Sequence, residues 1–289
     1  MYIEYFELNE KAFGNTPDPR FLYPCRQHQE ALARLEYSVE ERGIALITGE
    51  IGTGKTTVSR ALIDSLEKNY KPVLFLNPRF APAQFLRTLA QKLEIKPKHV
   101  KSEIVEQIHS KLFEYYERSI TPIVIVDEAQ LIPGKALFDE IRLLTNFQLD
   151  HTNLLSVILI GQPELARRLL HPAHAALNQR ITIRFHLRPL EEQDVYEYLM
   201  FRWTTAGGTE STFPFPPMAI TKIHSYSGGV PRLINSLATT CLIDALAKEV
   251  REINPAMVDQ QAAEIGLQMV SVTKLGERHG RHGRSAQAR

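Results

Sequence analysis

The sequence of 289 residues has only two cysteines, Cys25 and Cys241, and they lie far apart in the chain. Without closely spaced cysteines, neither a disulfide framework nor a Cys-x-x-Cys zinc site is predicted, and ordinary thiols in a reducing compartment are expected. Long apolar runs are also missing, because runs such as 154–160 are too short to span a bilayer. Residues 1–4 lack the basic and apolar regions of a signal peptide. These absences predict a soluble, cytoplasmic chain without membrane insertion.

An excess of charge of one sign is missing as well. The chain has 34 Lys and Arg against 33 Asp and Glu, which gives a formal net charge of +1. This balance does not indicate an overall nucleic-acid binder, although it is compatible with a local basic surface. Hydrophobic residues at 44% and charged residues at 23% are ordinary for a globular protein. The length suffices for about two domains.

A glycine-rich motif stands between an apolar stretch, 43–48, and a helical stretch, 57–68. It reads Gly49-Glu50-Ile51-Gly52-Thr53-Gly54-Lys55-Thr56 and fits G-x-x-x-x-G-K-[ST]. Glycine allows backbone N–H groups to turn toward a polyphosphate, and the helix N-terminus adds its dipole. The motif predicts that Lys55 contacts the β and γ phosphates and that the Thr56 hydroxyl binds Mg²⁺. A chance glycine turn is disfavoured because both flanks have the required pattern.

Two further polar positions follow predicted strands. The apolar run Ile123–Val126 ends in Asp127 and Glu128, which is the Walker B pattern. Asp127 is predicted to hold Mg²⁺ and Glu128 to polarise the attacking water. Gln162 follows the predicted strand 155–160 and is a candidate to touch the γ-phosphate or the water; the alternative is a glutamine in an exposed loop.

Two arginines are candidates for contact with phosphate groups of the nucleotide, and for Arg180 this is the γ-phosphate. Arg180 stands just before the fifth predicted strand, where it could reach the site of a neighbouring subunit as an arginine finger. The nearby Arg167, Arg168 and Arg184 are alternatives, and an ordinary surface role is open for each. Arg232 follows Pro231 in the first turn of a predicted helix, where the dipole disfavours a cation, so a bound phosphate is expected to compensate.

Strand and helix patterns alternate in the first two thirds of the chain. The predicted strands are Ile44–Thr48, Val73–Leu76, Ile123–Val126, Leu155–Ile160 and Ile183–Leu187. Such alternation predicts a parallel sheet covered by helices on both faces. The predicted helices after it are Glu191–Ala206, Pro216–Tyr226, Pro231–Lys248 and Pro255–Ile265. The expected organisation is an N-terminal segment and helix (1–42), a sheet core (43–188), a helical domain (189–266) and a basic tail expected to be disordered (267–289).

Together these motifs resemble the AAA+ ATPases. Several stretches resemble the ExeA family, the ATPases of general secretion pathway protein A, and its relatives in pilus assembly and mobile elements. These stretches are Thr16-Pro17-Asp18-Pro19, His28-Gln29-Glu30-Ala31-Leu32, Asp127-Glu128-Ala129-Gln130, Arg142-Leu143-Leu144-Thr145-Asn146, Gly161-Gln162-Pro163-Glu164-Leu165, Gln179-Arg180-Ile181 and Gly229-Val230-Pro231-Arg232-Leu233-Ile234-Asn235. The resemblance covers residues 2 to about 265.

The resemblance implies an α/β fold, with a P-loop NTPase parallel sheet of order 5-1-4-3-2 and a C-terminal helical lid. It implies Mg²⁺-dependent ATP hydrolysis in a ring or helical homo-oligomer, with the site at a subunit boundary and the segment Pro17–Tyr23 beside the adenine. The implied catalytic residues are Glu128, Lys55, Arg180 and Gln162. The implied nucleotide-binding residues are Gly49, Glu50, Ile51, Gly52, Thr53, Gly54, Lys55, Thr56, Thr57 and Arg232, with Thr56 and Asp127 on the metal.

Two biological uses are open at this point. One is an assembly factor of a secretion or pilus apparatus, although secretion-type members continue into a membrane span and a peptidoglycan-binding domain where this sequence has a short tail. The other is a TnsC/TniB-type regulator that binds DNA and recruits a transposase. The tail could follow a phosphate backbone or be a solvated terminus; its basic residues are Lys274, Arg278, Arg281, Arg284 and Arg289, against Glu277. A metal site at His279 and His282 is disfavoured because no further ligand is suitably spaced to complete it. A third use, a nucleotide-gated scaffold that does not hydrolyse ATP, is disfavoured by the presence of Glu128.

Overall fold

The chain folds into two compact units, each described here from a computed structural model that covers residues 2–149 and 152–270. The sheet unit comprises residues 17–188, and the helical unit comprises 2–16 with 189–270. The predicted N-terminal region 1–42 is therefore divided between the two units, and residues 2–16 are called the N-terminal segment below. The predicted basic tail, with His279 and His282, lies outside the described residues.

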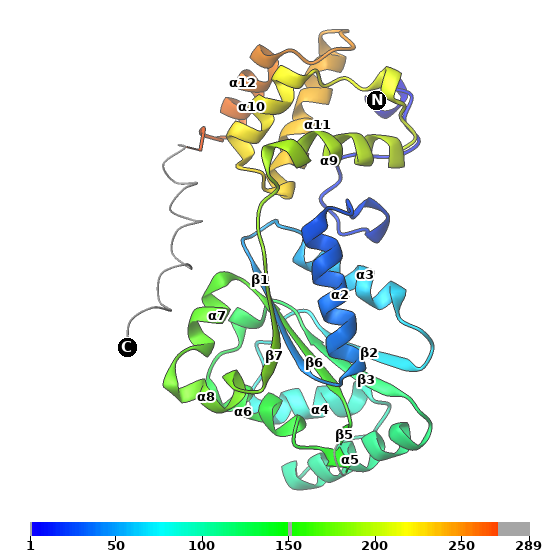
Figure 1. The fold of residues 1–289 in the computed structure, drawn as a ribbon, viewed down its shortest axis with the longest axis vertical. Helices are drawn as coiled ribbons and strands as arrows, with labels where there is room; N and C mark the ends of the chain where they lie inside the picture. Colours follow the sequence, from blue (N-terminus) through cyan, green and yellow to red (C-terminus); the bar gives the residue numbers. More distant parts are fainter. Residues whose placement is uncertain (1, 150–151, 271–289) are drawn as a thin grey trace. The chain divides into compact units, whose positions relative to one another are not determined.

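The sheet unit is built on five parallel strands (Figure 1). They are β1 (Ile44–Gly49), β2 (Tyr70–Phe75), β3 (Thr121–Val126), β6 (Ser156–Gly161) and β7 (Ile181–Leu187). Their order is β2-β3-β6-β1-β7, so the predicted order 5-1-4-3-2 is confirmed once these five are numbered among themselves. A separate antiparallel ladder pairs β4 (Gln148–Leu149) with β5 (Thr152–Asn153) and was not predicted, because two residues give no periodicity.

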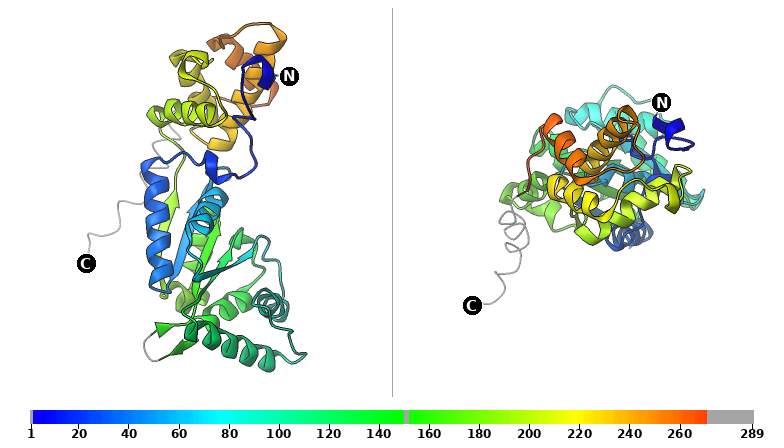
Figure 2. Two further views of the ribbon diagram at one scale, coloured as in Figure 1. Left: turned by 90° about the vertical axis from the view of Figure 1, so that its right-hand side faces the viewer. Right: turned by 90° about the horizontal axis from the view of Figure 1, so that it is seen from above.

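Alternate residues of the central strands pack into two apolar layers. Ala45 and Ile47 face one layer, with α2 (Arg26–Glu40) and α3 (Lys55–Ser65). Ile44 and Leu46 face the other layer, which is formed by α4 (Pro82–Lys92), α5 (Lys101–Glu117), α6 (Lys135–Leu144) and α7 (Pro163–Leu169). Figure 2 shows the two helical layers on opposite sides of the sheet. Because both faces are covered, every residue of β1, β3 and β6 is buried, which explains their unbroken apolar runs.

Several element boundaries differ from those predicted. The helix expected from residue 57 begins at Lys55, because Gly54 in the left-handed conformation serves as its N-cap. Strand β2 begins at Tyr70 and contains Pro72, which is tolerated because β2 lies at the edge of the sheet. Short elements complete the sheet unit: η1 (Pro19–Phe21), η2 (Ala129–Leu131), η3 (Pro172–His174) and α8 (Ala175–Asn178).

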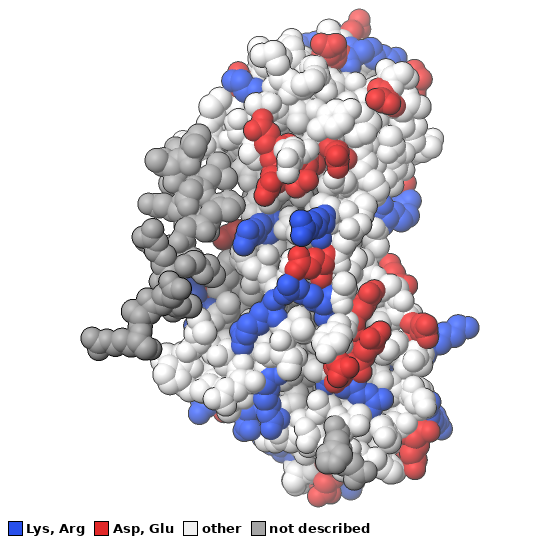
Figure 3. Space-filling view, in the orientation of Figure 1, with Lys and Arg blue, Asp and Glu red and all other residues white. Residues whose placement is uncertain are grey.

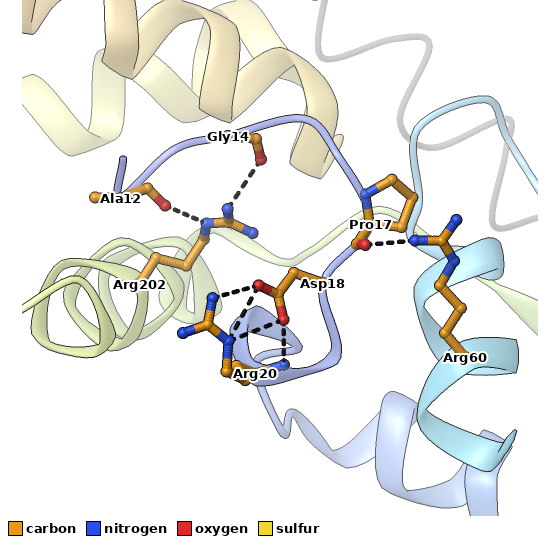
Figure 4. Close-up of polar contacts among 7 residues, drawn as sticks. All are labelled: Ala12, Gly14, Pro17, Asp18, Arg20, Arg60 and Arg202. Atoms are coloured by element: carbon orange, nitrogen blue, oxygen red, sulfur yellow. Dashed lines mark hydrogen bonds and ion pairs between the residues drawn. The ribbon is translucent and has the colours of Figure 1, made fainter. Parts of the chain in front are cut away.

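The helical unit surrounds the single tryptophan, Trp203, which is fully buried. Its elements are α1 (Tyr2–Tyr5), α9 (Glu192–Thr205), η4 (Glu210–Thr212), α10 (Pro217–Ser227), α11 (Pro231–Ala247) and α12 (Pro255–Glu264). The N-terminal segment contributes Phe6 and Phe13 to the aromatic cluster around Trp203. Arg202 holds the same segment, since its Nε donates to the Ala12 carbonyl at 2.8 Å and its Nη2 to the Gly14 carbonyl at 2.9 Å (Figure 4).

Two expectations about the whole chain concern membranes and thiols. Within the part of the chain that the structure describes, none of the helices has the length and apolar character needed to cross a bilayer. Cys25 and Cys241 are both buried thiols. Burial raises the pKa of Cys241 to about 12, so this thiol stays protonated at neutral pH.

Candidate nucleotide-binding and hydrolysis site

The glycines of the phosphate loop are required by the backbone. The loop connects β1 to α3, and Gly52 and Gly54 have φ angles of 85° and 93°. These values lie in the left-handed region, where a side chain is disfavoured. Glycine is required at position 49 for a different reason: a Cβ there would lie 2.7 Å from the Leu187 carbonyl oxygen on β7. The loop can therefore keep its backbone N–H groups clear of side chains, as an anion site needs.

Lys55 lies folded back against this loop. Its side chain is buried, and Nζ donates to the Gly49 carbonyl at 2.9 Å and to the Glu50 carbonyl at 2.8 Å. An ammonium forms stronger hydrogen bonds with an anionic oxygen than with a neutral carbonyl. Lys55 is thus held at the loop by contacts that a polyphosphate can replace.

Thr56 and Asp127 meet although they are far apart in the sequence. The Thr56 hydroxyl donates to Asp127 Oδ2 at 2.8 Å, and the Glu128 N–H donates to Asp127 Oδ1 at 2.8 Å. Burial raises the pKa of the Asp127 carboxyl, while these two hydrogen bonds act in the opposite direction. A hydroxyl and a carboxylate are oxygen ligands that Mg²⁺ accepts, so the two predicted metal residues fit the ion.

Glu128 has an unusual backbone conformation, with φ 53° and ψ 36°. A residue other than glycine in this left-handed region costs about 1–3 kcal/mol and needs support from its surroundings. Gln130 supplies a contact, because its Nε2 donates to Glu128 Oε2 at 2.5 Å. The carboxylate is therefore held in place directly after β3.

Gln130 also connects the ends of β3 and β6. Its Oε1 accepts a hydrogen bond from the Gln162 N–H at 3.0 Å, and its carbonyl accepts one from Arg168 Nη1 at 2.7 Å. Gln130 thus links the Gln162 backbone to the Glu128 carboxylate, and the contact of the Gln162 side chain with the γ-phosphate or the water stays a prediction. Sequence reasoning gave Gln130 no role, although it is the last residue of the family-like stretch Asp127-Glu128-Ala129-Gln130.

The candidate arginines of the sheet unit have contacts within their own unit. Arg180, between α8 and β7, donates through Nη1 to Thr145 Oγ1 at 2.7 Å and to the Arg142 carbonyl at 3.4 Å. Arg168 places its guanidinium 5.1 Å from the Phe138 ring centroid, and Arg184 donates to the Asn178 side chain at 2.7 Å. The structure therefore gives each of them a local role, and an action of Arg180 across a subunit boundary stays a prediction.

The segment expected beside the adenine is attached to the phosphate-loop region. Arg60 of α3 donates to the Pro17 carbonyl at 2.7 Å (Figure 4). At the other end, His28 Nδ1 donates to the Tyr23 carbonyl at 2.8 Å, and a Cβ on Gly54 would lie 3.7 Å from His28 Nε2. Residues 17–28 therefore lie next to the loop.

Arg232 belongs to the helical unit, where it is exposed in the first turn of α11. Its contact with a phosphate stays a prediction. On the face drawn in Figure 3, the basic and acidic side chains of the described residues are interspersed, as the net charge of +1 leads one to expect. This face gives no support to the expectation of DNA binding.

Comparison with known proteins finds a matching domain family and a similar protein. Residues 38–169 match the AAA domain family. The chain is 39% identical over 270 residues to general secretion pathway protein A of Aeromonas hydrophila, and the match covers 92% of this chain and 48% of that protein. The chain thus spans about half the length of this relative. The transposition alternative is not supported by these comparisons.

Two solved structures show the same fold. The ORC2 protein of Aeropyrum pernix superimposes with a TM-score of 0.68 at 17% identity, over 92% of this chain and 74% of that one. The RuvB Holliday junction branch migration motor of Thermotoga maritima gives 0.55 at 16% identity, over 82% and 69%. The matched domain, the strand order and these solved structures show that this chain has the AAA+ P-loop NTPase fold, and over most of its length it is similar to general secretion pathway protein A.

Proposed function

We propose that this chain hydrolyses Mg²⁺-bound ATP at the phosphate loop and that the hydrolysis cycle switches an assembly of copies of the chain. The observation that carries the proposal is the 2.8 Å contact between the Thr56 hydroxyl and Asp127, with Glu128 as the next residue. Metal-holding oxygens and a carboxylate base are thereby brought to one edge of the sheet. An isolated glycine turn would not need either partner.

Each residue has a distinct part in this proposal. The loop N–H groups and Lys55 bind the phosphates, while Thr56 and Asp127 would hold Mg²⁺, which when bound neutralises phosphate charge. Glu128 accepts a proton from water as the water oxygen forms its bond to the γ-phosphorus. The bond from that phosphorus to the β–γ bridging oxygen breaks, and ADP leaves with that oxygen. Gln162 orients the water or the γ-phosphate.

The use of the cycle is proposed from the similarity to general secretion pathway protein A. Arg180 would reach the site of a neighbouring copy, so that turnover depends on assembly, and Arg232 would contact the nucleotide from the helical unit. The partner would be a protein component of a secretion apparatus. The similarity at 39% identity over most of this chain supports that class of partner.

The test is a comparison of ATP binding and turnover in two variants. Glu128→Gln is expected to bind ATP and to lose about 10²–10⁴-fold in hydrolysis rate, whereas Lys55→Ala weakens binding as well. Glu114→Gln is the matched control, since this exposed acid of α5 pairs with Lys111. If Glu128→Gln hydrolyses ATP like the parent protein, the proposed base is wrong. Light scattering of Glu128→Gln with ATP and with ADP tests the switch, which predicts different sizes in the two states.

A further inference from the structure

Gln130 is the residue through which the end of β3, the end of β6 and α7 are connected. The two ends of its side-chain amide have different partners: Nε2 donates to Glu128 Oε2 at 2.5 Å, and Oε1 accepts from the Gln162 N–H at 3.0 Å. Its main chain is fixed as well, because Arg168 donates to its carbonyl at 2.7 Å. A glutamine bonded at both ends of its amide has one defined orientation.

The surroundings leave little room for another arrangement. A Cβ on Gly161 would lie 2.7 Å from Gln130 Oε1 and 2.8 Å from Leu165 Cδ2, so the bare glycine provides the space that the amide occupies. Glu128 meanwhile has the strained left-handed backbone described above. A strained residue whose carboxylate must meet water in a fixed place needs a contact that restricts its side chain.

The chemistry of an amide suits this position. A lysine or arginine would pair with the carboxylate and weaken it as a base, and a second carboxylate would repel it. A neutral amide donates one hydrogen bond to the carboxylate without adding charge, and it still offers an oxygen to a backbone N–H. Glutamine is the longer of the two amide side chains and spans from Glu128 to Gln162 here.

We infer that Gln130 is a positioning residue: it holds the Glu128 carboxylate for proton transfer and links it to the Gln162 peptide, so that the base and the end of β6 keep one geometry. This inference rests on the proposed role of Glu128 as the base. It assigns no contact of Gln130 with the nucleotide. Loss of the residue should therefore lower kcat without changing the affinity for ATP.

Two variants separate the two halves of the amide. Gln130→Glu has the same shape and keeps an oxygen for the Gln162 N–H, but it replaces the donor to Glu128 with a carboxylate. Gln130→Met removes both hydrogen bonds at similar length. For both, kcat is expected to fall roughly 10²-fold, as for a misplaced catalytic group, with an unchanged Kd for a fluorescent ATP analogue. Retained analogue binding and a parent-like melting curve show that each variant is folded.

Gln107→Glu is the matched control. This glutamine of α5 is also bonded at both ends of its amide, to the Lys98 N–H at 2.9 Å and to the Lys96 carbonyl at 3.1 Å, and neither hydrogen bond involves a site residue named here. Its replacement should leave kcat unchanged. If kcat falls only in the Gln130 variants, the fall is caused by the position of Gln130 and not by the exchange of an amide for a carboxylate in general.

The double variant Glu128→Gln with Gln130→Glu decides whether Gln130 acts through Glu128. If it does, the second change adds no further loss to Glu128→Gln, because effects through one group are not additive. A further loss in the double variant, or parent-like kcat in both Gln130 variants while Glu128→Gln is inactive, overturns the inference and leaves the proposed function standing. Parent-like turnover of Glu128→Gln itself would instead remove the proposed function on which the inference rests.

Discussion

Among the described residues, each unit buries one cation on backbone carbonyls, and the two cations are held very differently. Lys55 is 7% exposed and Arg202 is 8% exposed. Lys55 bonds to carbonyls of its own loop, five and six residues earlier in the chain. Arg202 bonds to the Ala12 and Gly14 carbonyls, which lie 190 and 188 residues earlier.

From this difference we expect the Lys55 charge to be functional and the Arg202 charge to be structural. An ammonium on a flexible stem can exchange the carbonyls of its loop for a ligand without displacing another part of the fold. A planar guanidinium that bonds a remote segment cannot move away without leaving carbonyls of that segment without their hydrogen-bond donors. We therefore expect changes at Lys55, Glu128 and Arg180 to affect turnover, and changes at Arg202 to affect stability.

The largest expected effect concerns Arg180, whose contacts with Thr145 and Arg142 resemble those of a structural residue. If it acts on a neighbouring copy, Arg180→Ala should lose about 10³–10⁵-fold in hydrolysis rate. Mixing it with Glu128→Gln should restore activity, because one kind of boundary then has both groups intact. The measurement is steady-state ATPase activity over a series of mixing ratios.

Arg184→Ala is the control for that experiment, since Arg184 lies on β7, the strand that follows Arg180, and bonds to Asn178. It should keep parent-like turnover. Activity that stays at background at every mixing ratio would show that Arg180 does not act across a boundary. It would then join Arg202 as a structural arginine.

The same contrast explains what the sequence could predict. The phosphate loop and the Walker B acids were predictable because they depend on local features: glycines with left-handed φ and unbroken apolar strands that end in polar residues. The strand order was predictable only through the resemblance to the AAA+ ATPases. The backbone partners of Arg202 and Gln130 were not predictable. A hydrogen bond to a backbone carbonyl or N–H has no side-chain signature at the accepting or donating position, so only the folded chain shows it.

Arg202→Ala tests the structural side of the comparison. Removing the guanidinium takes a donor from the buried Ala12 carbonyl and from the half-buried Gly14 carbonyl, which keeps Asn235 Nδ2 at 3.4 Å, and the expected loss is about 2 kcal/mol in the free energy of unfolding of the helical unit. Arg202→Lys should lose less, because a point charge can still reach one carbonyl. Urea unfolding followed by the fluorescence of Trp203 reports this unit, since it is the only tryptophan.

Arg251→Ala is the matched control in the same unit. Arg251 also contacts the N-terminal segment, through Glu7 at 3.7 Å and the Tyr5 ring at 4.3 Å, but its side chain is 58% exposed. Its replacement should cost well under 1 kcal/mol, as for exposed pairs in general, where the cost is about 0.2–1 kcal/mol. Equal losses for the two arginines would contradict the distinction drawn between them.

Asp127→Asn should raise stability at neutral pH when nucleotide and divalent metal are absent. Burial raises the pKa of Asp127 in the folded chain, so the ionised carboxylate opposes folding above that pKa. The amide removes this cost, and we expect the melting temperature to rise by a few degrees near pH 7. The advantage should fade as the pH falls through the raised pKa of the folded chain and vanish below about 3.9, the ordinary aspartate value, because both states are then protonated. A lower melting temperature at pH 7 would show that the hydrogen bonds to Asp127 outweigh its burial.

The smallest expected effect has the opposite sign and comes from Asp259 of the helical unit. Burial acts to raise the pKa of this carboxyl, but hydrogen bonds from Lys222 at 2.9 Å and Tyr226 at 2.9 Å outweigh it and hold the pKa below its ordinary value. Such a group stabilises the fold above its unfolded pKa and loses that effect as the pH falls through its folded pKa. Because the side chain is 41% exposed, we expect Asp259→Asn to cost only about 0.5 kcal/mol near pH 7.

The measurement for Asp259→Asn is the urea unfolding of the helical unit, read from Trp203 fluorescence at neutral and acidic pH. The loss should vanish in acid, where the parent carboxyl is protonated as well. As the pH is lowered, the stabilities of both variants should approach that of the parent protein, Asp127→Asn from above and Asp259→Asn from below. If Asp259→Asn instead raised stability at neutral pH, its burial would outweigh its partners. The carboxyl of the helical unit would then resemble Asp127, and the contrast between the two units would be confined to their buried cations.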